Sequence, residues 1–192
     1  MKATVSPSNA LCILRDEEHA TVKTLIDTLT DAEMTYPDSI NYGLYPDQSY
    51  SFKDLLAHMN AYEVHALDAY AAWEDGSQGH PIVADVLYRA REVHYASTAD
   101  RDHLSLAEMI DLYLSTAEKL EQLYANMSGK MWNMPYPMPS RNPDAAPVMG
   151  DVGGMLESIV VAPPRPLYRH MPVHIPNVER YINRVRNRVK SL

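Results

Sequence analysis

The chain has 192 residues, 46% of them hydrophobic, and a formal net charge of −8 at pH 7. This length fits one domain, residues 1–192, with a single buried core, and this composition excludes wholesale disorder. The acidic balance argues against nucleic acid as a partner, and no apolar run reaches the ~20 residues that a membrane helix needs. The lone cysteine, Cys12, allows no intramolecular disulfide, so we expect a cytoplasmic protein with no membrane partner.

The first predicted element is a helix over residues 9–29, in which the apolar residues approximate one helical face. A loop follows over residues 34–50, because Pro37, Gly43 and Pro46 break regular structure there. The apolar positions of the helix are Leu11, Leu14, Val22, Leu25, Ile26 and Leu29.

The second predicted helix begins at Ser51, which has the capping-box spacing to Asp54. Its apolar residues recur in steps of three and four as far as Trp73, which places them on one face. A shorter helical connector is expected over residues 82–96. The apolar face of the second helix comprises Phe52, Leu55, Met59, Tyr62, Ala66, Ala69 and Trp73.

The third predicted helix begins after a second capping-box pattern, Ser105 with Glu108, and ends before Gly129. Residues 130–150 are rich in proline and methionine, and no strand pattern is convincing there or elsewhere. This excursion either lines an apolar pocket or packs over the end of the helices. The residues that could do so are Met131, Trp132, Met134, Tyr136 and Met138.

A short helix is predicted over residues 151–161 and a last helix up to the end of the chain. The last helix carries Ile175, Val178, Ile182, Val185, Val189 and Leu192 in steps of three and four. Amphipathic helices without strands predict an all-α fold, an antiparallel four-helix bundle. The long segments before the second and last helices favour crossover connections over short hairpin loops.

Three histidines form a candidate metal site. His58 flanks the apolar face of the second helix, and His170 and His174 are four residues apart, which would stack both imidazoles on one helical face. Three neutral imidazoles suit Zn²⁺, Ni²⁺ or a similar metal and leave coordination positions open. The alternative is that these are ordinary polar residues, because eight histidines allow accidental spacings.

Three segments resemble the DinB/YfiT-like superfamily. Residues 51–59, SFKDLLAHM, are similar to its "DLLAHL" helix, and residues 168–175, YRHMPVHI, are similar to its late "HxxxHI" helix. Residues 102–110, DHLSLAEMI, resemble the start of its third helix. The resemblance covers roughly residues 8–30, 51–128 and 155–190.

The resemblance implies a DinB-like four-helix bundle with a divalent metal, nickel or zinc, on one histidine of the second helix and two of the fourth. These match His58, His170 and His174. Relatives in this superfamily include thiol-dependent S-transferases, a mycothiol-dependent maleylpyruvate isomerase and a colibactin self-resistance hydrolase, and dimers are frequent. A low-molecular-weight thiol cofactor and a homodimer are therefore expected. Pro172, between the two histidines, departs from the pattern. A proline is well tolerated only in the first turn of a helix, and a helix that starts there would leave His170 just outside it.

The remaining reactive residues carry weaker patterns. His65 follows His58 by seven residues and is either a fourth ligand, a general base or a rim histidine. Cys12 is expected to be a small buried side chain. The histidines without a partner pattern, expected at the surface, are His19, His80, His94 and His103.

The leading hypothesis from the sequence is a metal-dependent enzyme that activates a thiol or water against a small, apolar electrophile. Thiol transfer is the first choice and hydrolysis the second. The alternative is a metal-free bundle that binds a small ligand or serves in a stress response without catalysis. A third interpretation is a structural dimerisation module.

Overall fold

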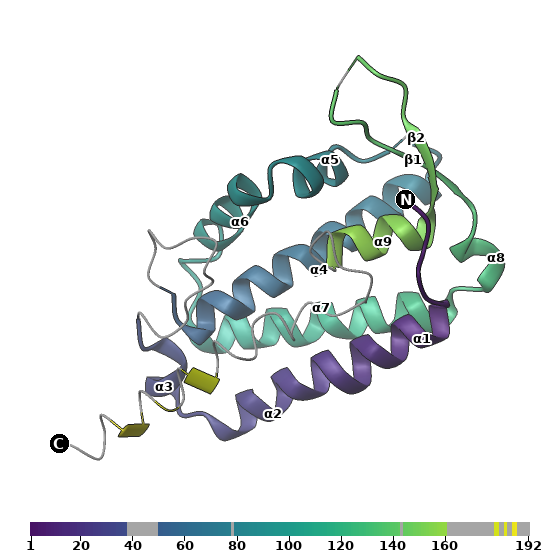
Figure 1. Ribbon diagram of the computed structural model, residues 1–192. Coiled ribbons are helices and arrows are strands. Elements are labelled where there is room, and N and C mark those ends of the chain that lie inside the picture. Colours follow the sequence, from purple (N-terminus) through teal and green to yellow (C-terminus); the bar gives the residue numbers. More distant parts are fainter. Residues whose placement is uncertain are drawn as a thin grey trace.

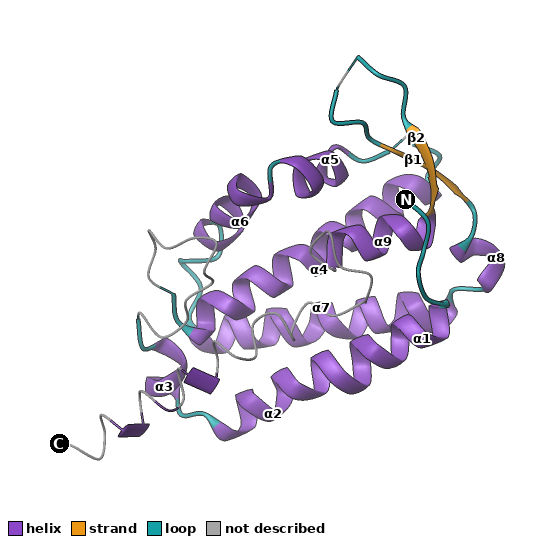
Figure 2. Ribbon diagram, in the orientation of Figure 1, coloured by secondary structure: helices purple, strands orange, loops and turns teal. Residues whose placement is uncertain are grey.

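The computed structural model describes residues 1–37, 50–77, 79–142, 144–160, and residues 179, 180, 183, 186 and 187. Within this part the protein is mostly helical, with one small two-stranded sheet (Figures 1 and 2). The all-α prediction is confirmed at this level. None of the described helices combines the length and apolar composition needed to cross a bilayer.

The two long central helices, α4 (Phe52–Glu74) and α7 (Leu106–Asn126), lie side by side (Figure 1). Both predicted capping boxes are present: the Ser51 hydroxyl accepts from the Asp54 amide, and that of Ser105 from the Glu108 amide. In each case the carboxylate accepts the backbone N–H of the serine, so two donors at each helix start are satisfied.

The predicted first helix is three consecutive helical elements, α1 (Pro7–Cys12), the π-helix η1 (Ile13–His19) and α2 (Ala20–Thr28). Together they run along α7, and the short helix α3 (Asp31–Thr35) follows them (Figure 1). A π-helix changes the angular spacing of side chains along the helix. Here it contains two adjacent buried polar residues, Glu18 and His19.

Helix α4 is covered on several sides. Besides α7, it packs against α9 (Val152–Val160) and α6 (Ala90–Ala99). Helix α6 continues from α5 (Pro81–Tyr88), so the predicted connector is two helices. Because of this cover, α4 buries polar as well as apolar side chains, among them His58, Asn60 and Glu63.

The proline-rich excursion contains strands, so the expectation of no strands is wrong there. After the short helix α8 (Gly129–Trp132), β1 (Pro135–Met138) pairs antiparallel with β2 (Val148–Asp151). A two-stranded sheet consists of edge strands, which tolerate proline. Trp132, Tyr136 and Met138 are buried in the core, which favours a segment packed over the helix end.

The N-terminal residues are fastened to the β2–α9 junction. The backbone N–H of Ala3 donates to Asp151, and those of Thr4 and Val5 donate to the buried carboxylate of Glu157. Asp151 also accepts from the Gly154 amide at the start of α9. These contacts fasten the N-terminal segment to the start of α9.

Replacing Gly153 by alanine is expected to destabilise the protein. A Cβ atom at Gly153 would overlap the indole of Trp132, which is 1% exposed and donates to the Val5 carbonyl. Overpacking of this kind costs about 1–3 kcal/mol. The measurement is urea denaturation, with Gly129→Ala as the control because nothing lies within 4 Å of a Cβ there. Equal midpoints for the two variants would contradict this packing.

Candidate functional site

His58 lies in the interior on α4, not merely at the flank of the apolar face. Its exposed fraction is 5%, and the Tyr62 ring packs edge-on against it with 4.7 Å between ring centroids. A histidine in this position needs hydrogen-bond partners within the protein, because water does not reach it freely.

His94 of α6 supplies one such partner. The two Nδ1 atoms of His58 and His94 are 2.9 Å apart, and the Nε2 atom of His94 is 2.8 Å from the Tyr50 hydroxyl. The three side chains therefore form a buried chain from α4 through α6 to Tyr50, which lies just before the N-cap residue of α4. Burial lowers the pKa of His94 to about 4, so this imidazole is neutral at pH 7.

The position of His94 corrects the sequence interpretation, which placed it at the surface. Its exposed fraction is 0%, because the face of α6 that carries Val93 and Ser97 packs on α4. Val93 and Ser97 are four residues apart and lie on one face of α6. His94 lies three residues before Ser97, at the edge of this face, so the sequence contained only a weak signal that His94 is buried.

The His58–His94 contact has two possible proton arrangements, because one Nδ1 must donate and the other accept. If His58 donates, its Nε2 carries a lone pair, and His94 donates from Nε2 to the Tyr50 oxygen. If His94 donates, the Nε2 of His58 carries the proton, and the Tyr50 hydroxyl donates to His94. Only the first arrangement presents a metal-ligating lone pair at the His58 Nε2 atom.

The other two predicted ligands, His170 and His174, lie outside the described residues. Within the described part, no group of three or more His, Cys, Asp or Glu side chains has an arrangement that could hold a metal ion. The three-histidine site therefore stays a prediction, of which the structure describes only His58.

A second buried polar cluster surrounds His19, which the sequence interpretation also placed at the surface. Its Nδ1 atom is 2.7 Å from Glu121 of α7, and its Nε2 atom is 3.1 Å from Glu63 of α4. The exposed fraction of His19 is 0%. The sequence did hold a signal for buried charge here, since Glu18 fills the gap between Leu14 and Val22 in the apolar spacing.

The two carboxylates decide the protonation of His19. Burial lowers the pKa of His19, but hydrogen bonds to Glu121 and Glu63 outweigh this effect and raise the pKa to about 9. Burial raises the pKa of Glu63, whereas the hydrogen bond from His19 lowers that of Glu121. His19 is thus a buried cation at neutral pH, and Glu121 is its ionised partner.

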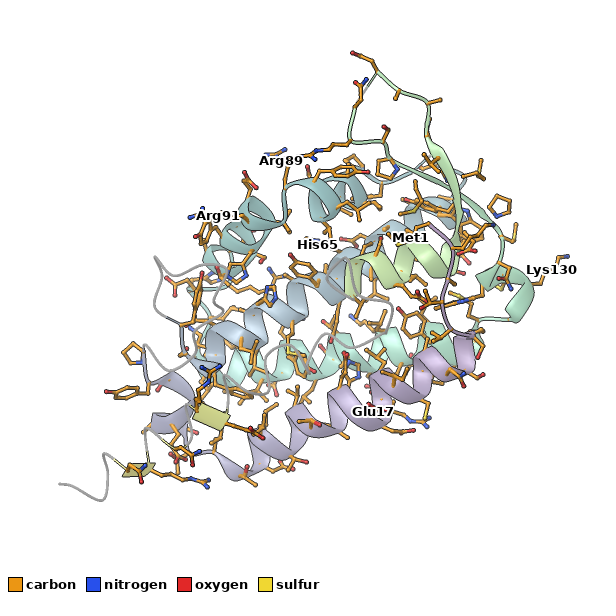
Figure 3. All side chains as sticks on the ribbon, in the orientation of Figure 1. Met1, Glu17, His65, Arg89, Arg91 and Lys130 are labelled. Carbon is orange, nitrogen blue, oxygen red and sulfur yellow. The ribbon has the colours of Figure 1, made fainter. Side chains whose placement is uncertain are left out.

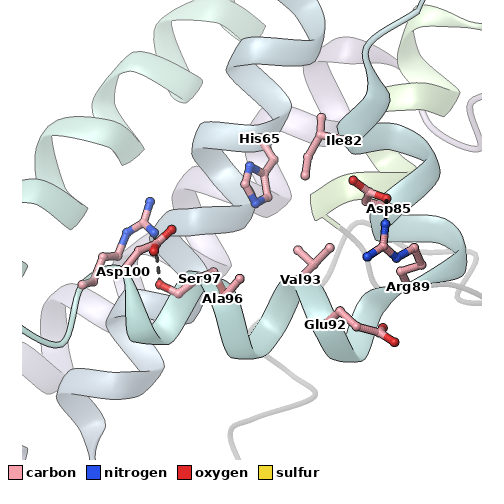
Figure 4. Close-up of a pocket in the computed structure, with 10 residues that line it drawn as sticks. His65, Ile82, Asp85, Arg89, Glu92, Val93, Ala96, Ser97 and Asp100 are labelled. Carbon is pink, nitrogen blue, oxygen red and sulfur yellow. Dashed lines mark hydrogen bonds and ion pairs between the residues drawn. The ribbon is translucent and has the colours of Figure 1, made fainter.

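A cavity of about 270 Å³ lies between α4, α5 and α6. His65 projects into it from α4, facing Ile82 of α5 and Val93 of α6 (Figure 4). Figure 3 places the same imidazole between α4 and the α5–α6 connector, whereas Glu17 lies on an outer face of the first helix. Burial, with a smaller contribution from Arg101, lowers the pKa of His65, so it is neutral at pH 7.

Cys12 is exposed, so the expectation of a buried side chain is wrong. Its thiol donates to the Asp16 carboxylate over 3.2 Å, and this hydrogen bond raises the pKa of Cys12. A raised thiol pKa disfavours the thiolate, so Cys12 lacks the environment of a nucleophile.

No protein family model matches this sequence, and neither a curated protein nor a solved structure is significantly similar to it.

The His19 cluster predicts a stability that falls as pH rises from about 6.5 to 9. In that range the folded protein keeps the His19 proton that the unfolded chain releases, so raising pH favours unfolding. The loss is up to about 3 kcal/mol, by converting the pKa shift. It is measured by urea denaturation across this pH range.

Two variants give this pH series its controls. His103→Gln removes an exposed histidine and should leave the slope unchanged, whereas His19→Gln should flatten it. Since His19→Gln could unfold, the wild-type imidazole is also titrated by NMR. An unprotonated His19 at pH 7.5 would contradict the buried ion pair.

Proposed function

We propose that this protein is a DinB-like four-helix bundle and a metal-dependent enzyme of thiol S-transferase or hydrolase type. The divalent ion, nickel or zinc, would be held by His58, His170 and His174, and a homodimer is part of this proposal. The substrate would be a small electrophile.

The proposal depends chiefly on the buried chain His58–His94–Tyr50. Histidine ligands generally donate their second ring N–H to another group, which fixes the tautomer and the ring orientation. The Nδ1 contact of His58 with His94 is of this kind in the arrangement in which His58 donates. It would leave Nε2 as the ligating atom of His58.

The donor set agrees with the proposed metal. His58 is 5% exposed, and three imidazoles are typical ligands for zinc and nickel. When bound, the ion would lower the pKa of a thiol or water molecule brought to it. His94 would act as a positioning residue: it would accept a hydrogen bond from Nδ1–H of His58 and donate one from its own Nε2–H to the Tyr50 oxygen.

The cavity supports a small substrate. Its volume, about 270 Å³, is at the small end for ligand pockets, and His65 follows His58 by seven residues on α4. Seven residues of α-helix rise about 10 Å. A neutral His65 at the cavity wall could accept a proton released from a bound reactant.

A second candidate function is metal-free binding of a small ligand. The same cavity favours it, because the cavity is formed entirely by described residues and needs no ion. The two functions differ in their response to a chelator. Ligand binding that persists after chelation and in a His58→Ala variant would favour the second function.

Elemental analysis of protein purified without an affinity tag is expected to find about one equivalent of nickel or zinc per chain. His58→Ala and His174→Ala should each lose the metal, because two imidazoles hold such an ion poorly. His103→Ala is the matched control, since it removes an exposed histidine. No metal in the wild type, even after addition of Ni²⁺ or Zn²⁺, would overturn the metalloenzyme proposal.

The same titration tests His94 separately. His94→Phe should keep the stoichiometry but weaken metal affinity about 10–100-fold, because the imidazole of His58 loses its orienting partner. Unchanged affinity in this variant, beside lost binding in His58→Ala, would remove the positioning role of His94 and leave the metal site intact.

Metal-loaded protein is expected to accelerate the reaction of glutathione with an activated chloroarene at least about tenfold over the thiol alone. The acceleration should vanish in His58→Ala. Cys12→Ser is the control, since the only cysteine is exposed and its thiolate is disfavoured. Activity that follows Cys12 and not His58 would contradict the metal-dependent mechanism.

A further inference from the structure

Arg101 is a half-buried cation without a carboxylate partner in the described part of the chain. It lies in the turn after α6 and lines the cavity beside His65. The ion pairs of the described residues leave Arg101 out, although Asp100 is its neighbour in sequence. Burying a charged side chain costs free energy unless the charge is paired or well hydrogen-bonded.

The guanidinium is held in one orientation by groups from three helices. The Thr116 hydroxyl of α7 donates to the Leu112 carbonyl, so its oxygen accepts from the Asn60 side-chain N–H over 2.9 Å. The amide oxygen of Asn60 therefore faces Arg101 and accepts from its Nε atom over 2.8 Å. Asn60 is 0% exposed, so this orientation is fixed by buried contacts.

Most of the Arg101 donors are left over after these contacts. Nε donates to Asn60 and Nη1 to the Ser97 carbonyl over 3.1 Å, whereas a guanidinium has five N–H donors. A planar guanidinium with spare donors matches a carboxylate, which accepts two parallel hydrogen bonds. A preoriented arginine loses little entropy when it binds such a group.

Part of the cavity wall is aliphatic and could contact an apolar body. Ile82 and Val93 lie opposite the His65 ring, and Ala96 is on the same helix as Val93 (Figure 4). A volume of about 270 Å³ accommodates a group the size of one aromatic ring. A ligand here would contact aliphatic side chains along its length and Arg101 at one end.

The acidic lining residues limit the charge of the ligand. Asp85 is paired with Arg89 over 3.2 Å, but Glu92 and Asp100 are exposed carboxylates on the same wall. Two further negative charges near the cavity would repel a dianion such as a phosphate monoester. A singly charged carboxylate is repelled less than a dianion, and it can accept hydrogen bonds from Arg101, which forms no ion pair among the described residues. Burial lowers the pKa of Arg101, and Asp100 lies near enough to oppose that shift.

We propose that this cavity binds a small monocarboxylate, with the carboxylate on Arg101 and the apolar body against Ile82 and Val93. The proposal does not depend on metal at His58, and it assigns a ligand class to the cavity. The competing explanation is structural. Arg101 would then serve only as a cation that satisfies the Ser97 carbonyl at the end of α6, which needs no ligand.

The test uses three matched probes, benzoate, benzamide and phenyl phosphate, with the full chain followed by NMR. Benzoate is expected to shift the Arg101 Nε–H and His65 signals with a Kd of about 1 mM or lower. Bound benzoate should also raise the His65 pKa, because its charge offsets that of Arg101. Benzamide and phenyl phosphate should bind at least about tenfold more weakly.

Two variants complete the test. Arg101→Gln should lose benzoate binding at least about tenfold, and Arg101→Lys, which keeps the charge without the planar fork, should be intermediate. Arg91→Gln is the matched control, because Arg91 is an exposed arginine of α6 outside the cavity (Figure 3). For each variant, an NMR spectrum that matches the wild type away from the substituted residue is the criterion that the variant is folded. Equal binding of benzoate and benzamide, or benzoate binding that survives Arg101→Gln, would overturn the proposal in favour of the structural role.

Discussion

The burial of α4 is the constraint on which the rest of this structure depends. Helices α6, α7 and α9 all pack on α4, so water does not satisfy the polar side chains that α4 buries. A buried polar group without a partner costs about 1–3 kcal/mol. His58, Asn60 and Glu63 therefore each require partners from a neighbouring element, and each has at least one: His94 of α6, Thr116 of α7 and His19 of η1.

The buried partners of these three residues differ in charge and lie on different elements. Glu63 is directed to the first helix, where a charged histidine between two carboxylates ties α4, η1 and α7 together. Asn60 is directed to α7 and fixes an arginine at the end of α6. His58 is directed to α6 and a neutral imidazole. The residues of the ionised network do not line the cavity described above, whereas the two other networks reach α6, which forms a wall of it.

The elements that the sequence could predict are those specified locally. Capping boxes and apolar spacing lie within a few residues of each other, so α4 and α7 were predicted with their starting residues. The burial of His19 and His94 depends on contacts with residues 36 or more positions away, which no local pattern contains. The strands β1 and β2 were missed because prolines break the usual alternation, and their pairing joins residues across a long loop.

Helix α6 connects the two proposals physically. Its His94 contacts His58, and the turn after it carries Arg101, so one helix would orient a metal ligand and support the carboxylate anchor. Both contacts depend on the same packing of α6 against α4, and Val93 and Ser97, which line the cavity, flank His94 in sequence. A displacement of α6 would alter the cavity and the orientation of His58 together. A carboxylate that fills the cavity would favour the packed position of α6, and this position is also the one in which His94 reaches His58.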